Sequence, residues 1–177
     1  MRASKAYNST QAMAALFQRM IPGSSIAANM IHVALFSGTP PTDDQLTALN
    51  TTTASQFTWT ATTIAAFASQ SQMLANCAVQ AITPIMDYDN NILSLPIGGQ
   101  SSLATVAAAG TPTWFMLRMT TAAQASDAWG GFANGNIATV IITGTVGDEN
   151  SNADMRILGG TVALNQPVRL ADLRIKF

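Results

Sequence analysis

Charge is scarce in this sequence. Lys, Arg, Asp and Glu together make up 10% of its 177 residues, whereas an ordinary soluble domain contains about a quarter. The formal net charge of −1 excludes the broad basic surface of a sequence-independent nucleic-acid binder. Hydrophobic residues make up 48%, which excludes an acidic disordered chain, because disorder requires low hydrophobicity and high net charge.

Cysteine and histidine are almost absent, with one residue of each. Cys77 has no second cysteine for a disulfide, and we interpret it as a small buried apolar side chain. His32 lies within an apolar run, which favours a histidine in the core or on an edge strand over a general base. No activating motif surrounds Cys77, so the two residues do not indicate a nucleophile with its base.

The sequence also lacks an apolar segment of the kind that spans a membrane. Its longest uncharged run, residues 45–86, is interrupted by Thr, Ser, Gln and Asn far too often for a stretch of about 20 apolar residues. Arg2 and Lys5 resemble the basic start of a signal peptide, but no continuous apolar stretch follows them. We therefore expect a soluble, unexported protein with no membrane partner.

The length suits one domain with an arm, because two full cores need more chain. Residues 9–20 have the pattern of a short amphipathic helix, which a Pro-Gly pair ends at 22–23. The apolar residues of this helix are Met13, Leu16, Phe17 and Met20. We predict an N-terminal helical arm at 1–29 and a β domain at 30–177, with these four residues as a possible subunit interface. A helix packed on the domain's own sheet is equally compatible with the pattern.

From residue 30 onward the sequence is typical of β structure, with turn residues between short apolar or alternating runs. The predicted strands are residues 30–36, 57–60, 114–120, 137–146, 161–164 and 168–177. Residues 65–81 are ambiguous between a helical stripe and a strand that covers 79–86. In the last strand the alternation slips by one at 171–172, which predicts a bulge or bend. We predict a mainly β fold, an antiparallel β-sandwich or a jelly-roll-like domain.

Acidic residues are the candidate catalytic and metal-binding groups. The pairs Asp43–Asp44 and Asp87/Asp89 are conceivable as the two carboxylates of a glycosidase, but both lie among turn residues, where Asp accepts hydrogen bonds from its own backbone. Residues 148–154 are the densest set of oxygen ligands and are conceivable as a Ca²⁺ site. They lack the EF-hand spacing, which favours a solvated hairpin loop.

The three tryptophans divide into two kinds. Trp59 and Trp114 lie within strand patterns and are expected in the core, whereas Trp129 precedes two glycines and is expected to be exposed. With the loop at 148–154, Trp129 is the basis for an alternative reading as a receptor- or glycan-binding module. We predict no catalytic residue, cofactor, metal or small-molecule substrate.

The few charges have an uneven distribution along the chain. Between Met20 and Leu117 there is no Lys or Arg and there are only four Asp, all expected in turns. Most basic residues lie instead near the two ends of the chain. A surface with so little charge depends on other contacts for its solubility, so we expect the middle of the chain to be covered by its own core and by neighbouring copies.

Three segments resemble a family of small virion proteins of tailed bacteriophages. Residues 32–41 (HVALFSGTPP) are similar to the family's "LYSGTQP"-type strand and turn, and residues 110–118 (GTPTWFMLR) to its "GTAGWFRL"-type strand. Residues 144–147 (GTVG), 153–155 (ADM) and 168–177 resemble its "GSVG…GADL" element and closing strand. The resemblance covers 30–177 in the same order, without the stretch around 65–109.

The resemblance implies a non-enzymatic building block of the phage particle with a β-sandwich fold. We expect a structural subunit of the tail or the head-to-tail region, the neck or collar. Its expected partners are copies of itself and other virion proteins, without specific nucleic acid, and its place is the virion, which assembles in the host cytoplasm. A capsid decoration protein on the outside of the head is the alternative within this class.

Overall fold

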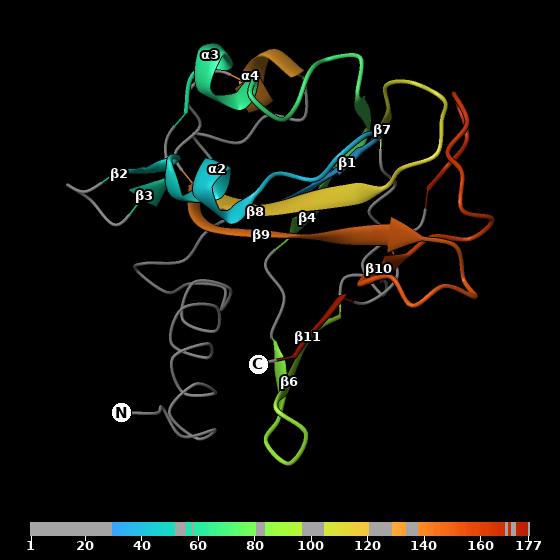
Figure 1. Cartoon of the computed structure of the whole chain (residues 1–177). Coiled ribbons are helices and arrows are strands. Elements are labelled where there is room, and N and C mark those ends of the chain that lie inside the picture. Colours follow the sequence, from blue (N-terminus) through green and yellow to red (C-terminus); the bar gives the residue numbers. More distant parts are fainter. Residues whose placement is uncertain are drawn as a thin grey trace.

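The computed structural model describes residues 30–51, 56–57, 59–80, 84–96, 105–120, 129–133, 138–168, 170 and 173–176. The predicted arm at 1–29 lies outside this set, together with Met13, Leu16, Phe17 and Met20, so the arm and its boundary stay predictions. The described part is mainly β and contains two sheets (Figure 1). This confirms the mainly β part of the predicted fold class, whereas the sandwich or jelly-roll arrangement stays a prediction.

The larger sheet has the strand order β2-β3-β9-β8-β1-β4-β7 within the described residues, and β10 pairs with the outer end of β9. Its strands are β1 (Met30–Phe36), β2 (Asn50–Thr51), β3 (Gln56–Phe57), β4 (Met73–Gln80), β7 (Thr105–Val106), β8 (Trp114–Thr120), β9 (Ala138–Gly147) and β10 (Met155–Arg156). All pairs are antiparallel except β10 with β9, which is parallel. The long central strands β1, β8 and β9 confirm the predicted strands at 30–36, 114–120 and 137–146.

The smaller sheet has the order β11-β6-β5, and both pairs are antiparallel. Its strands are β5 (Ile85–Asp87), β6 (Ile92–Leu95) and β11 (Leu173–Lys176). A tight turn joins β5 to β6 and ends at Asn91, whose φ of 52° lies in the left-handed region that Asn tolerates better than most residues. Figure 1 shows this sheet below the larger one.

Strands β1 and β8 are buried on both faces, which explains their nearly continuous apolar sequences. On β8, Phe115 and Leu117 face the smaller sheet, whereas Trp114 and Met116 face the opposite side. Strands buried on both faces lose the apolar–polar alternation of a half-exposed strand. The burial of both faces therefore follows from the larger sheet lying in the middle of the molecule.

The first core fills the space between the two sheets. It joins strands of both sheets with the chain after β10: Ile31, Val33, Leu35, Leu74, Ala75, Leu93, Leu95, Phe115, Leu117, Val146, Met155, Ile157, Val162, Val168, Leu170 and Leu173. Burial of apolar surface stabilises a fold by about 25 cal/mol per Å². This shared core therefore holds the smaller sheet against the larger one.

The second core lies on the other face of the larger sheet, under α3 (Ala61–Ile64) and α4 (Trp129–Ala133) (Figure 1). Phe36 and Trp114 stack at its centre with ring centroids 4.3 Å apart. Phe132 packs against Phe36 at 5.3 Å and against Trp59 at 6.0 Å, and the indole N–H of Trp59 donates a hydrogen bond to the carbonyl of Phe132. The predicted burial of Trp59 and Trp114 is confirmed, with exposed fractions of 2% and 0%.

Two predicted local structures near the N-terminal end of the domain were wrong. Asp43 and Asp44 form the first turn of α2 (Asp43–Thr47) instead of a turn, because Thr42 and Gln45 make a capping box. Of the predicted strand 57–60, Phe57 lies at the end of β3, whereas Trp59 and Thr60 lie in no strand, because Thr60 caps the start of α3. Short helices set by capping hydrogen bonds carry too few residues to show a helical period.

The C-terminal part forms less strand than predicted. In the described residues, Val162 makes an isolated bridge with Gly110, and Leu170 makes one with Ile157. Only Leu173–Lys176 forms a regular strand, and it pairs with β6. The predicted bulge at 171–172 lies outside the described residues. On either side of it in the sequence, Leu170 pairs with Ile157 and Leu173 pairs with Leu95. The ambiguous segment 65–81 contains β4, so its second half is a strand.

No helix in the described part of the chain is long and apolar enough to cross a membrane.

Gly144 tests the close packing of β9 against its neighbours. A Cβ atom at this position would lie 2.8 Å from Phe115 Cε1 and 2.8 Å from Asp154 Oδ2. We expect Gly144→Ala to lower the free energy of unfolding by about 1–3 kcal/mol through overpacking, measured by chemical denaturation. Gly130→Ala is the matched control, because a Cβ there meets nothing within 4 Å. Equal stability of the two variants would contradict the packing described.

Candidate functional site

Parts of the segments quoted for the resemblance lie at one end of the larger sheet, whereas the closing strand at 173–176 lies in the smaller sheet. Phe36 of β1 pairs with Trp114 of β8, and Trp114 pairs with Thr145 of β9. The chain therefore brings residues 36–41, 110–114 and 144–147 together at neighbouring strand ends. We call this region the motif junction.

Backbone hydrogen bonds connect the motif junction across all three strands. The N–H of Thr113 donates to the carbonyl of Phe36 at 2.8 Å, and its hydroxyl donates to the carbonyl of Gly38. The N–H of Val146 donates to the carbonyl of Thr113 at 2.9 Å. Thr113 thus joins the loop after β1 to the end of β9.

Asp154 completes the junction from the loop after β9. Its Oδ2 accepts hydrogen bonds from the backbone N–H and the hydroxyl of Thr145, both at 2.8 Å. The N–H of Asp154 donates in return to the Thr145 hydroxyl at 3.1 Å. Gly144 lies directly under this carboxylate and leaves no room for a side chain. The Gly-Thr and Ala-Asp motifs are therefore two halves of one contact.

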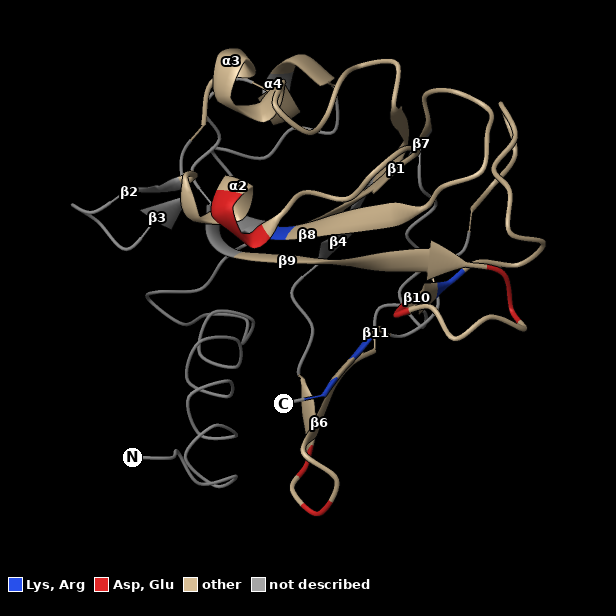
Figure 2. Ribbon diagram, in the orientation of Figure 1, with Lys and Arg blue, Asp and Glu red and all other residues tan. Residues whose placement is uncertain are grey.

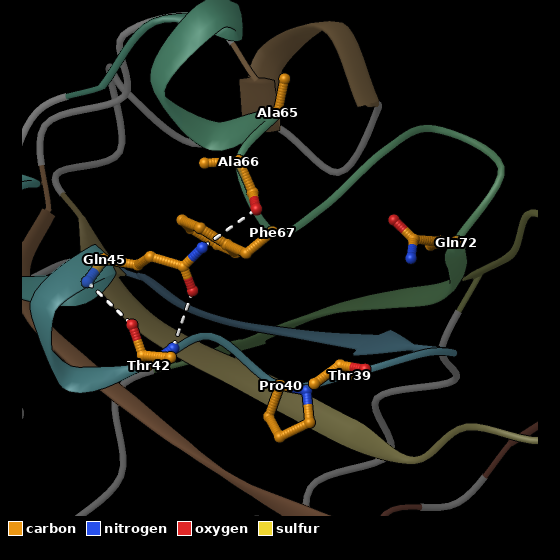
Figure 3. A pocket seen from close by; sticks show the side chains of 8 residues that line it. All are labelled: Thr39, Pro40, Thr42, Gln45, Ala65, Ala66, Phe67 and Gln72. Atoms are coloured by element: carbon orange, nitrogen blue, oxygen red, sulfur yellow. Dashed lines mark hydrogen bonds between the residues drawn. The ribbon is translucent and has the colours of Figure 1, made fainter.

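A groove of about 410 Å³ opens beside the motif junction (Figure 3). One wall is the loop after β1 with α2, and the other is the segment from α3 to the start of β4. Its lining residues are Thr39, Pro40, Thr42, Gln45, Ala65, Ala66, Phe67 and Gln72. None of these side chains is titratable, so the groove offers hydrogen-bonding groups and apolar contact without charge.

Gln45 holds the two walls of the groove together. Its Oε1 accepts from the N–H of Thr42 at 2.8 Å, and its Nε2 donates to the carbonyl of Ala66 at 3.0 Å (Figure 3). One side chain thus completes the capping box of α2 and spans the groove to the chain after α3. The width of the groove depends on this bridge.

Gly38 and Gln72 close one end of the groove. The N–H of Ser37 donates to the carbonyl of Gln72 at 2.9 Å. Gly38 has a φ of +91°, and a Cβ there would lie 2.7 Å from Gln72 Nε2. The left-handed backbone conformation therefore favours glycine here, whereas the amide lies at the end of a flexible side chain.

The pair Asp87/Asp89 forms a turn, as predicted. Asp87 Oδ1 accepts from the N–H groups of Asp89 and Asn90, each at 3.1 Å, and its Oδ2 accepts from Asn90 Nδ2 at 2.8 Å. The side-chain amide of Asn90, followed by its backbone N–H, holds the pKa of Asp87 below its usual value. The carboxylate of Asp87 therefore stabilises the turn between β5 and β6.

The acidic loop at 148–154 uses its carboxylates in the same way. Asp148 Oδ1 accepts from the N–H of Asn150 at 3.0 Å, and Glu149 Oε2 accepts from the N–H of Gly159 at 2.8 Å. Bonds from its own N–H and from Gly159 lower the pKa of Glu149. The described residues contain no group of three or more His, Cys, Asp or Glu arranged to hold a metal ion.

His32 and Arg118 are opposite each other on β1 and β8, and both are 1% exposed. This confirms the predicted core position of His32. The Arg118 guanidinium carbon lies 4.9 Å from the ring centroid of Phe132 and 5.9 Å from that of Trp59. The sequence reasoning missed this buried cation, although an arginine inside an apolar strand is the signal that marks it.

Two further predicted positions differ in outcome. Trp129 lies in α4 and is half-buried, with its ring 5.6 Å from that of Phe132, so the predicted exposed tryptophan is wrong. Its packing against the second core explains the difference. Cys77 pairs through its backbone with Val33, next to the pair of His32 with Ala78; its side chain lies outside the described part of the structure, so its predicted burial stays a prediction.

Comparison of the chain with protein-family models, with curated proteins and with solved structures finds no match in any of the three.

Gln45 provides a test of the groove. We expect Gln45→Ala to lower the free energy of unfolding by about 1 kcal/mol, because the hydrogen bond that joins the walls and the one that completes the capping box are both lost. Gln166→Ala is the matched control, since Gln166 is an exposed glutamine in a turn far along the chain. Thermal denaturation of both variants measures the difference. A Gln45→Ala protein as stable as the control would show that the bridge does not hold the groove.

Proposed function

We propose that the chain is a non-enzymatic structural subunit of a tailed bacteriophage particle, in the tail or the head-to-tail region. It works by self-assembly and by packing against other virion proteins. In this proposal the β domain is an antiparallel β-sandwich or a jelly-roll-like domain, and residues 1–29 form a helical arm. Its place is the virion, which assembles in the host cytoplasm.

The observation that carries the proposal is the motif junction. The parts of the quoted segments at 36–41, 110–114, 144–147 and 153–155 are distant in sequence, yet they meet at the ends of β1, β8 and β9 and are joined there by Thr113 and Asp154. Short similarities found by chance have no physical reason to form one contact. Their convergence supports the view that they are parts of one structural element.

The arrangement of the two sheets supports the sandwich. Leu93, Leu95 and Leu173 of the smaller sheet pack into the same core as Phe115 and Leu117 of the larger sheet. Two sheets that face each other across a common apolar layer are the defining feature of a β-sandwich. The larger sheet adds a second covered face under α3 and α4.

The surface supports assembly. Among the residues that the structure describes, four large apolar side chains are well exposed: Ile85 at 61%, Tyr88 at 65%, Leu158 at 85% and Leu164 at 53%. Ile157, Leu158, Thr161, Pro167 and Val168 line an apolar hollow of about 210 Å³. Exposed apolar groups on a chain with so little charge are typical of surfaces that other protein copies cover.

The stoichiometry of the chain in purified phage particles tests the proposal. We expect a small fixed number of copies, as in a ring of the neck or tail, measured by quantitative mass spectrometry against the major capsid protein. Hundreds of copies would instead indicate a decoration protein or a tube. Absence of the chain from purified particles would contradict the proposed function.

Deletion of residues 1–25 tests the proposed arm. We expect the shortened chain to fold but to enter particles at least about tenfold less, because its amphipathic helix no longer docks on a neighbouring subunit. A variant with Leu16 and Phe17 both changed to Ser keeps the length of the arm and separates its apolar contacts from its reach. Unchanged incorporation of both variants would overturn this role of the arm.

A further inference from the structure

The two outer strands of the smaller sheet differ in charge. β11 carries the exposed Arg174 and Lys176, whereas β5 ends at the exposed Asp87 and leads to Asp89. Figure 2 shows blue along β11 and red in the turn at the free end of β6. Within the described residues, neither outer strand has a further strand beside it. The sheet thus has one basic edge and one acidic edge.

The register of this sheet determines how another strand would meet it. Because β5 and β11 both run antiparallel to β6, they run parallel to each other. The three rows across the sheet are Ile85–Ser94–Arg174, Met86–Leu93–Ile175 and Asp87–Ile92–Lys176. The middle row faces the first core, where Leu93 is buried and Met86 and Ile175 are partly buried. The other two rows face outward.

We propose that a second copy of this chain binds here, with its acidic strand β5 beside the basic strand β11 of the first copy. If the rows continue straight from one copy to the next, Asp87 of one copy lies beside Lys176 of the other. Opposite charges on neighbouring strands stabilise their pairing. In the middle row Met86 meets Ile175, so each copy covers an apolar side chain at the margin of the other's core.

The charge on Asp87 is secure at neutral pH. Hydrogen bonds from Asn90 lower the pKa of this carboxyl group below its usual value. The carboxyl group is therefore ionised at neutral pH. Arg174 and Lys176 on β11 carry the opposite formal charge. The contrast between the two edges is therefore present under physiological conditions.

The charges also determine which edges can pair. Two β11 strands side by side would bring four cations together, and two β5 strands would bring the acidic groups of both copies together. Lys and Arg on an outer strand commonly prevent strand pairing between copies, and here they exclude the β11–β11 contact but favour β11 with β5. A contact between two different edges is head-to-tail, and it closes into a ring or continues as a filament.

This inference names a partner for the proposed structural subunit and rests on that proposal for its setting in a particle. The experiment uses the purified full chain and measures its oligomeric state by light scattering and native mass spectrometry. We expect assemblies of more than two copies for the wild-type chain, with association weakened by added salt.

Charge reversal on β11 is the decisive variant. We expect Arg174→Glu with Lys176→Glu to weaken association by at least about tenfold, because attraction between the edges becomes repulsion. Arg156→Glu is the matched control, since Arg156 is an exposed cation on β10 in the other sheet, and we expect its association to match the wild type. Asp87→Asn keeps the Oδ1 acceptor of the turn and removes the charge, so it should weaken association as well.

The outcomes separate this contact from the proposed function. Wild-type chain that stays monomeric or forms only a two-fold dimer would overturn the contact, as would full association of the folded Arg174→Glu/Lys176→Glu variant. If circular dichroism shows that this variant does not fold, Arg174→Gln with Lys176→Gln gives the same test without repulsion. A monomeric chain found in particles overturns only the strand contact, whereas an assembling chain absent from particles overturns only the virion role.

Discussion

The pairing of β1 with β8 brings the two cores of this protein back to back. Each strand carries large apolar side chains on both faces, so successive residues along it belong alternately to the first core and to the second core. The smaller sheet depends on Leu35 and Leu117 for its apolar contact, and the helices depend on Phe36 and Trp114 for theirs. Without the paired strands β1 and β8, the smaller sheet and the helices α3 and α4 have no apolar surface on which to pack. They depend on this packing because short strands and single-turn helices are only marginally stable alone.

The scarcity of charge has a physical explanation in this architecture. A sheet covered on both faces offers little solvated surface for charged side chains, so the described ones lie mostly in turns, on outer strands and in the first turn of α2 (Figure 2). Arg118 is the exception among the described residues of the larger sheet's centre, and it lies against the faces of Phe132 and Trp59. The carboxylates of the turns at 87–91 and 148–154 accept hydrogen bonds from backbone N–H groups. These acidic side chains therefore stabilise the conformation of the loops in which they lie. The same confinement leaves charge on the edges of the smaller sheet, where it can direct contact between copies.

The central strands could be predicted because their residue types agree with their surroundings. Residues 30–36 and 114–120 are β-branched, aromatic or long apolar residues between clear turn signals. The helices at 43–47 and 61–64 could not be predicted from periodicity, because each depends on a threonine cap and one reciprocal hydrogen bond. The groove beside them follows from those helices, so it was not predicted either. Trp129 was misjudged because the two glycines after it indicated a turn, while Phe132 three residues later holds it against the core.

The sequence by itself determined the mainly β class, the long central strands and the role of Asp87 and of the acidic loop at 148–154 in turns, because these depend on neighbouring residues and on local hydrogen bonds. The tertiary structure alone decided which segments meet. It placed Thr113 and Asp154 at the same strand ends, paired Leu170 and Leu173 with different partners, and set Asp87 and Lys176 at opposite edges of one sheet. Such contacts join residues far apart in the chain. Which segments pair depends on how all the apolar faces are buried together, and a local sequence pattern does not predict this.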